Sequence, residues 1–233
     1  MWRNGGIAAM LFGLCANLCA AELTIRLTNA SGAPLVDAVV FDSGARAASG
    51  SPPVRKRETI VQRNRVFDPF VTVVEKGTVI SFPNEDPMLH HVYSFSPAKR
   101  FEIKLYKGTA AAPVVFDRAG VVALGCNVHD WMLAYVLVTE TPIFGKSGND
   151  GVVRLPSLAA GTHELMAWYP GMREPVPLQS VTLAANESRS IDHRLQVAIR
   201  TQPKAPPLDP MRYSLFMGHR SLSDADRCTA AGS

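Results

Sequence analysis

Short apolar runs, each bounded by turn-forming residues, recur along most of the chain. In the first of them, Leu23, Ile25 and Leu27 alternate with polar residues, which is the two-residue period of a half-buried strand. Apolar residues make up 47% of the 233 residues, so the chain can bury a sizeable core. Short strands at regular spacing indicate an antiparallel sandwich or barrel. The sequence therefore predicts an all-β protein.

The strand candidates fall into a central group and two flanking groups. The central group comprises 70–74, 79–82, 91–95, 101–106, 114–116, 120–124 and 133–138. The flanking groups comprise 23–27 and 39–41 before it, and 152–155, 164–168, 180–183 and 188–195 after it. Residues 43–56 have the composition of a linker, and 141–150 are expected to form a loop. Proline and small polar residues are frequent in 199–233, where we expect a flexible tail.

The first 21 residues have the pattern of a secretory signal peptide. A positive residue, Arg3, is followed by an uncharged apolar run over 7–18 and by the small residues Ala20 and Ala21. The apolar run is too short to span a bilayer comfortably, and an uncleaved N-terminal anchor is the alternative. We expect cleavage after Ala20 or Ala21 and export to the periplasm, with no membrane contact after cleavage.

Export determines how the four cysteines are interpreted. Cys15 and Cys19 lie in the signal peptide, so the exported chain keeps only Cys126 and Cys228. Two distant cysteines do not make a disulfide framework. Cys126 follows an apolar, strand-like run, and a buried structural cysteine is the simplest interpretation of that position. The residues that follow it indicate a different role.

Cys126, His129 and Met132 form the motif Cys-x2-His-x2-Met. This spacing places a thiolate, an imidazole and a thioether on one short loop between two predicted strands. Thiolate and thioether suit copper(I), imidazole suits both oxidation states, and two histidines with one cysteine and a weak axial methionine make a blue-copper site. His90 or His91, at the start of a strand, can supply the second imidazole. Zinc is the rival metal, but it favours a fourth hard or thiolate ligand over methionine.

The region from about residue 60 to residue 138 resembles the cupredoxins of the plastocyanin and amicyanin kind. The resemblance depends on the opening strands over 67–82, the Phe-x-Asn and His-x-Val pattern over 82–92, and the ligand loop 126–132. The whole chain also resembles the proteins known as methylamine utilization proteins, in which Cys-Asn-x-His-Asp-Trp-Met recurs. The resemblance implies a Greek-key β-sandwich over 57–142 that holds one type 1 (blue) copper ion.

The resemblance also implies that His90, rather than His91, joins the three motif residues as a ligand. In the family, the residue after the upstream histidine gives its backbone N–H to the thiolate, and its side chain supports the ligand loop. Here that residue is His91, and Asn127 stands where serine or threonine is usual. We expect His91 to hydrogen-bond Asn127 and orient the loop. A solvent-facing His91, or an exchange of roles with His90, is the alternative.

Residues 22–45 and 148–198 are each too short to bury a sheet alone. Through 29–39 and 151–170 they resemble the start and finish of a small carboxypeptidase regulatory-like (prealbumin-like) β-sandwich. We therefore expect a discontinuous second sandwich that contains the copper domain as an insertion, because the close ends of a domain tolerate insertion. One extended cupredoxin with added strands is the alternative.

These observations predict a periplasmic type 1 copper protein that transfers single electrons between unidentified redox partner proteins. Copper binding or delivery without a redox role is the alternative. A net charge of only +4, without a basic run that includes aromatic residues, argues against nucleic acid as a partner. No Ser/His/Asp set stands in a supporting context, so we do not expect an enzyme. His163 is expected to be a satisfied sheet residue rather than a ligand.

Overall fold

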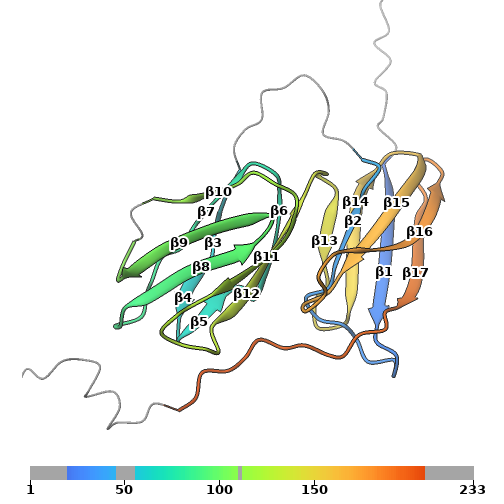
Figure 1. The fold of residues 1–233 in the computed structure, drawn as a ribbon. Helices are drawn as coiled ribbons and strands as arrows, with labels where there is room; N and C mark the ends of the chain where they lie inside the picture. The colour runs from blue at the N-terminus through green and yellow to red at the C-terminus, as the bar shows by residue number, and fades with distance from the viewer. Residues whose placement is uncertain (1–19, 46–55, 110–111, 208–233) are drawn as a thin grey trace, which may run out of the picture.

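The computed structural model describes residues 20–45, 56–109 and 112–207. These residues form seventeen β-strands and no helix, which confirms the prediction of an all-β protein. The strands build two sandwiches that lie side by side (Figure 1). The predicted signal peptide, apart from Ala20 and Ala21, lies outside the described residues, as does Cys228. No helical segment in the described ranges has the length and apolarity that a membrane span requires.

The first sandwich is built from the central part of the chain. Its larger sheet has the strand order β6-β12-β11-β8-β9, and its smaller sheet has the order β10-β7-β3. The strands of the larger sheet are β6 (Val71–Glu75), β8 (His90–Ser96), β9 (Lys99–Tyr106), β11 (Gly120–Gly125) and β12 (Leu133–Thr139). Those of the smaller sheet are β3 (Arg57–Thr59), β7 (Thr78–Ser81) and β10 (Val114–Phe116). Strands β4 (Val61–Arg63) and β5 (Val66–Asp68) form a two-stranded hairpin.

Apolar side chains fill the first sandwich. The rings of Phe67, Phe82 and Phe116 are among its fully buried side chains, and burying one such ring contributes about 1.5–3 kcal/mol relative to leaving it exposed. Cys126 and Met132 belong to the same buried cluster. Two predicted ligands are therefore part of the hydrophobic core and do not lie on an exposed loop.

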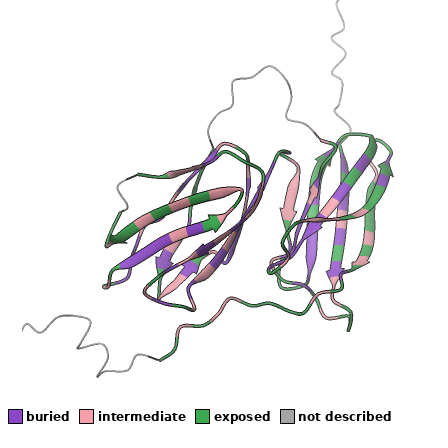
Figure 2. Cartoon of the chain, in the orientation of Figure 1, coloured by how far each residue is buried: buried purple, intermediate pink, exposed green. Residues whose placement is uncertain are grey.

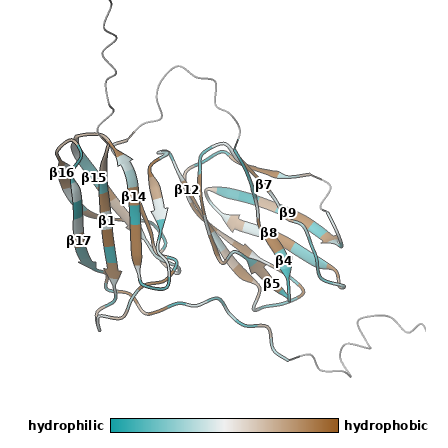
Figure 3. Cartoon of the chain, turned by 180° about the vertical axis from the view of Figure 1, so that it is seen from behind, coloured by the Kyte–Doolittle hydropathy of each residue, from teal (hydrophilic) through white to brown (hydrophobic). Residues whose placement is uncertain are grey.

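The second sandwich takes its strands from both sides of the first in sequence. One sheet has the order β14-β1-β17 and the other the order β13-β2-β15-β16. The strands of the first of these sheets are β1 (Ala21–Thr28), β14 (Val152–Leu158) and β17 (Ser188–Arg194). Those of the second are β2 (Val39–Asp42), β13 (Phe144–Lys146), β15 (Gly161–Trp168) and β16 (Val176–Leu183). Alternate residues of β1 are fully buried, and Figure 3 shows the matching bands of hydropathy along this strand.

Strand β13 lies where the sequence predicts a loop. Its Phe144 pairs with Phe41 of β2. The ammonium group of Lys146 donates to the carbonyl oxygen of Val71 at 2.8 Å and pairs with Asp37 at 3.1 Å. A strand of three residues is too short for an alternating pattern, and its contacts are made with distant parts of the chain. The later of the two segments that form the second sandwich therefore includes β13, whereas the sequence predicts that this segment starts at residue 148.

A third apolar cluster joins the two sandwiches. It combines Val39 and Trp168 of the second sandwich with Phe70, Val71 and Leu137 of the first. These side chains are buried, and Figure 2 shows buried segments on both sandwiches where they face each other. Burial of this kind resists separation of the two units.

Residues 199–207 differ from the flexible tail that the sequence predicts. The backbone N–H of Arg200 donates to the hydroxyl of Tyr169 in the second sandwich at 2.9 Å. The Gln202 amide then donates to the carbonyl oxygen of Phe67 in the first sandwich. The Arg65 guanidinium donates to the carbonyl oxygen of Pro206 at 2.8 Å. This part of the tail therefore contacts both sandwiches. The sequence does not reveal these contacts, because each hydrogen bond includes a backbone group, which every residue has.

Candidate metal centre

Two neighbouring strands of the larger sheet present the predicted ligands at the same end. His90 is the first residue of β8, and Cys126 directly follows the last residue of β11. The strands are antiparallel, and Gly125 of β11 lies opposite Tyr93 of β8. A Cβ atom on Gly125 would lie 2.7 Å from the Tyr93 Cζ, so glycine at this position lets the end of the Tyr93 ring lie against the backbone. The loop that begins at Cys126 leads back into the sheet through β12.

The ligand atoms of His90, Cys126 and His129 converge at this end. All of them lie within 4.8 Å of one another. The Nδ1 of His90 is 4.0 Å from the Cys126 Sγ, and the two imidazole centroids are 4.9 Å apart. The exposed fractions are 0% for His90, 4% for Cys126 and 9% for His129. The chain therefore brings the His90 imidazole to a thiol and an imidazole that lie 36 or more residues later, in a site that is nearly closed to water.

Met132 lies close to the other motif residues. Its side chain is 2% exposed, and it lines the same small cavity as Cys126. Its backbone N–H donates to the carbonyl oxygen of His129 at 3.0 Å, which closes the loop into a turn. The burial and the turn are compatible with an axial ligand, and its role as a ligand stays a prediction.

Cys126 has a strongly perturbed pKa. Burial raises the pKa of the thiol, but the neighbouring imidazoles of His129 and His90, together with the backbone N–H groups of His91 and Val128, lower it to about 5. The thiolate is the form that binds metals, so at neutral pH the sulfur is ready for coordination. The backbone contact from His91 is the one that the resemblance to cupredoxins implies.

His129 has a nitrogen without a partner. Its Nδ1 is buried and makes no hydrogen bond within the described residues. Burying a polar atom without a hydrogen bond costs about 1–3 kcal/mol, and a bound metal ion would remove that cost. The imidazole also packs against Trp131, with ring centroids 4.9 Å apart.

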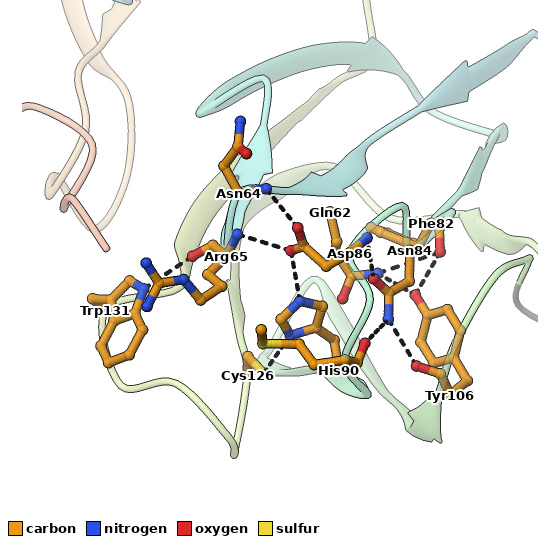
Figure 4. Close-up of polar contacts among 11 residues, drawn as sticks. Gln62, Asn64, Arg65, Phe82, Asn84, Asp86, His90, Tyr106, Cys126 and Trp131 are labelled. Carbon is orange, nitrogen blue, oxygen red and sulfur yellow. Dashed lines mark hydrogen bonds and ion pairs between the residues drawn. The ribbon is translucent and has the colours of Figure 1, made fainter. Parts of the chain in front are cut away.

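The His90 imidazole contacts the carboxylate of Asp86 (Figure 4). The distance from its Nε2 to the Asp86 Oδ2 is 2.8 Å. Because an ionised carboxylate only accepts hydrogen bonds, His90 donates through Nε2. Burial lowers the pKa of His90, but hydrogen bonds to Cys126 and Asp86 outweigh it and raise the pKa above its ordinary value. The bond to Asp86 leaves Nδ1 facing the cysteine.

The expected contact between His91 and Asn127 is wrong. The Nε2 of His91 lies 2.9 Å from the Glu102 Oε1 of the neighbouring strand β9. His91 is only 5% exposed, so the solvent-facing alternative is also wrong. An exchange of roles with His90 does not fit either, because successive side chains of a strand point to opposite faces and the side chain of His90 faces Cys126.

Sequence reasoning missed two acidic partners of the histidines. Asp86 lies four residues before His90, and this short separation is a signal in the sequence that the two side chains can meet. Glu102 lies eleven residues after His91 and meets it through the pairing of β8 with β9. A shift in the register between these strands, next to His91, makes that contact impossible to deduce from spacing alone.

The converging side chains are of the kinds that can bind copper. Two imidazoles and one thiolate make a donor set that suits this metal in both of its oxidation states. Within the described ranges, these three residues form the one cluster of three or more histidine, cysteine or acidic side chains whose ligand atoms converge. The cluster contains no fourth hard or thiolate donor, which disfavours a structural zinc site.

Comparisons with known proteins find solved structures that match part of this chain at low identity. The chain matches no family model, and no curated protein matches it. A purple cupredoxin from Nitrosopumilus maritimus is 21% identical, with a TM-score of 0.32, and the match covers 35% of this chain and 99% of that one. A mutant of amicyanin in its reduced Cu(I) form is 18% identical, with a TM-score of 0.32, over 44% of this chain and 98% of that one. A copper-containing nitrite reductase from Thermus scotoductus is 20% identical, with a TM-score of 0.34, over 41% of this chain and 25% of that one.

Proposed function

We propose that this chain is a periplasmic type 1 copper protein of the cupredoxin kind that transfers single electrons. His90, Cys126, His129 and Met132 would hold one copper ion. The observation that carries the proposal is the convergence of two imidazoles and a low-pKa thiol within 4.8 Å. A bound copper ion supplies a one-electron couple, and this donor set suits both of its oxidation states.

The chain contributes a rigid arrangement of ligands. His90 and Cys126 stand at the ends of paired strands, and Met132 is packed in the core. Interiors packed at this density resist displacement, so the ligands keep one geometry whatever the charge at the centre. Little rearrangement during a change of oxidation state favours fast electron transfer.

His129 is the route by which electrons would leave. It is the most exposed of the three converging side chains, and it contacts the half-buried Trp131. An apolar surface around such a histidine suits a transient protein partner. We therefore expect redox proteins of the periplasm as partners, and neither nucleic acid nor, after cleavage of residues 1–21, a membrane.

The burial of the ligands favours electron transfer over copper delivery. A delivery protein has to release its ion to an acceptor, which requires ligands that an acceptor can reach. Here the exposed fractions of the three converging residues are 0%, 4% and 9%. Ligands this well buried suit electron transfer better than a reaction on a bound substrate, so we do not expect catalysis at this centre.

Loading the exported protein with Cu(II) tests the proposal. We expect an intense visible absorption band and an EPR spectrum with narrow copper hyperfine splitting at one copper per chain. Cys126→Ser should lose both signals because it removes the thiolate. Cys228→Ser, the matched substitution at the other cysteine of the exported chain, should retain both.

Two results would count against electron transfer in particular. A colourless Cu(II) complex of the wild-type protein would remove the type 1 assignment. A coloured complex that passes its copper to a weak chelator within seconds, and shows no reversible reduction potential, would instead support copper delivery.

A further inference from the structure

A buried carboxylate stands directly behind the imidazole of His90. Asp86 is 7% exposed and His90 is fully buried. The 2.8 Å contact joins the Asp86 Oδ2 to the His90 Nε2, whereas the Cys126 Sγ lies 4.0 Å from Nδ1, on another edge of the same ring. Asp86 is therefore not placed as a ligand but contacts the copper centre through His90.

The turn of the β4–β5 hairpin holds this carboxylate. Asn64 and Arg65 both have positive φ, 55° and 59°, and this conformation turns their two backbone N–H groups toward the same place. The Asn64 N–H donates to the Asp86 Oδ1 at 2.7 Å, and the Arg65 N–H donates to Oδ2 at 2.8 Å (Figure 4). Charge-assisted bonds of this kind are about twice as strong as neutral ones. Both oxygens of the carboxylate are thereby held in place.

The loop before β8 is fixed as well. The Asn84 Oδ1 accepts the backbone N–H of Asp86 at 3.0 Å. The amide of Asn84 donates to the carbonyl oxygens of Met88 and Tyr106 at 2.9 and 2.8 Å. The side chain of Asp86 therefore has little freedom to leave His90.

The same hairpin turn also contacts the ligand loop. The indole N–H of Trp131 donates to the carbonyl oxygen of Arg65 at 2.9 Å. Trp131 lies next to His129, so the turn is bonded to both segments that carry the imidazoles. A displacement of the turn would disturb both of them.

We propose that Asp86 is a positioning residue that orients His90 toward the copper ion and, through its negative charge, favours the oxidised ion. This inference depends on the proposed function only for its second part. A histidine ligand that donates its other N–H to a carboxylate keeps one orientation and becomes a stronger donor. A buried anion next to the centre also stabilises the more positive of the two oxidation states, which lowers the reduction potential.

The orientation of His90 can be tested without copper. In the metal-free, isotope-labelled protein, NMR should show a slowly exchanging ring proton on the Nε2 of His90. Asp86→Leu, which removes the acceptor at similar size, should make that proton exchange rapidly, and Glu85→Gln should leave it protected. An unprotected Nε2 proton in the wild-type protein, or equal protection in Asp86→Leu, would overturn the positioning role.

The effect of the charge is tested by electrochemistry on the copper-loaded protein. Asp86→Asn keeps the shape of the side chain, and it should lower the ratio of Cu(II) to Cu(I) affinity about tenfold, which raises the reduction potential by about 59 mV. Glu85→Gln is the matched control, because it removes the same charge from the adjacent, half-exposed residue that pairs with Arg63. We expect its shift to be much smaller because solvent screens that charge.

Equal shifts in the two variants, or no shift in Asp86→Asn, would overturn the electrostatic part. If the protein takes up no type 1 copper, the proposed function fails. The NMR experiment on the metal-free protein still tests whether Asp86 positions His90. The two failures are therefore distinguishable.

Discussion

Each sandwich contains a buried histidine that contacts a buried aspartate. In the first, the His90 Nε2 lies 2.8 Å from the Asp86 Oδ2, and in the second, the His163 Nδ1 lies 2.7 Å from the Asp42 Oδ2. The exposed fractions of all four residues are below 8%. Distance and burial therefore do not separate the two pairs.

The second ring nitrogen does separate them. The Nε2 of His163 meets the carbonyl oxygen of Ala159 at 2.9 Å, so both of its nitrogens face acceptors and both donate. This confirms the prediction that His163 is a satisfied sheet residue. The Nδ1 of His90 instead faces the Cys126 sulfur and the ring of His129. His90 thus has one nitrogen anchored and the other directed at a sulfur and a second imidazole, as the proposed copper site requires, whereas His163 uses both nitrogens to connect segments of the second sandwich.

Removing each imidazole should produce the largest contrast. His90→Ala should reduce copper affinity more than about 100-fold, since loss of an outer-shell partner alone reduces it about 10- to 100-fold. His163→Ala should leave copper affinity unchanged, because the ring contacts no predicted ligand. Competition titrations with a copper chelator measure both. A comparable loss of affinity in His163→Ala would break the distinction between the pairs.

The next largest effect is expected from the aspartate of the second pair. Asp42→Asn should lower the free energy of unfolding by about 3 kcal/mol, because it leaves a buried imidazolium without its counter-charge. The blue colour of the copper-loaded protein should stay. Urea unfolding followed by circular dichroism gives the free energy.

Asp192 offers a matched control for that variant. It pairs with Arg26 at 3.6 Å, but its side chain is 85% exposed. Exposed pairs contribute little to stability, so Asp192→Asn should change the free energy of unfolding by less than about 0.5 kcal/mol. Equal losses of unfolding free energy in Asp42→Asn and Asp192→Asn would show that the buried pair stabilises the fold no more than the exposed one.

A pH dependence should distinguish the second pair further. Burial lowers the pKa of His163, but the hydrogen bonds to Asp42 and Ala159 outweigh it and raise the pKa above 6.5. Since the folded pKa is higher than the unfolded one, the stability from protonated His163 is fully present below about pH 6.5 and declines as pH rises through the folded pKa. The difference in unfolding free energy between the wild-type protein and His163→Gln should therefore shrink as pH rises above about 6.5. A difference that grows over this range would contradict the assigned protonation.

Two tightly packed glycines give the smallest expected effects. A Cβ on Gly145 would lie 2.7 Å from the Val153 Cγ1 and 3.0 Å from the Arg154 carbonyl oxygen, whereas one on Gly125 would meet only the far end of the Tyr93 ring. Gly145→Ala should therefore cost about 1–3 kcal/mol and leave the copper spectrum alone. Gly125→Ala should cost less, because the tyrosine can move, and should shift the absorption band. Thermal unfolding measures the loss of stability, and visible spectroscopy measures the absorption band. A larger loss of stability in Gly125→Ala, or a shifted band in Gly145→Ala alone, would contradict this prediction.

The sequence predicts the strands and the motif well, because both depend on local spacing. The alternation of Leu23, Ile25 and Leu27 reappears as the buried face of β1. The motif from Cys126 to Met132 becomes a loop between two strands, and the structure brings its cysteine and histidine together with His90.

The remaining features depend on contacts that spacing does not encode. Asp86 meets the turn at Asn64 and Arg65 more than twenty residues earlier in the chain. The partner of His91 depends on the irregular register of β8 and β9. The short strand β13 exists because β2 lies beside it. Each of these follows from tertiary packing, which overrides local preference.

X-ray absorption spectroscopy at the copper edge tests the central claim most directly. The account predicts one short copper–sulfur distance and two copper–nitrogen distances in the wild-type protein, with the sulfur contribution lost in Cys126→Ser and kept in Cys228→Ser. A first shell made only of nitrogen and oxygen in the wild-type protein would contradict it.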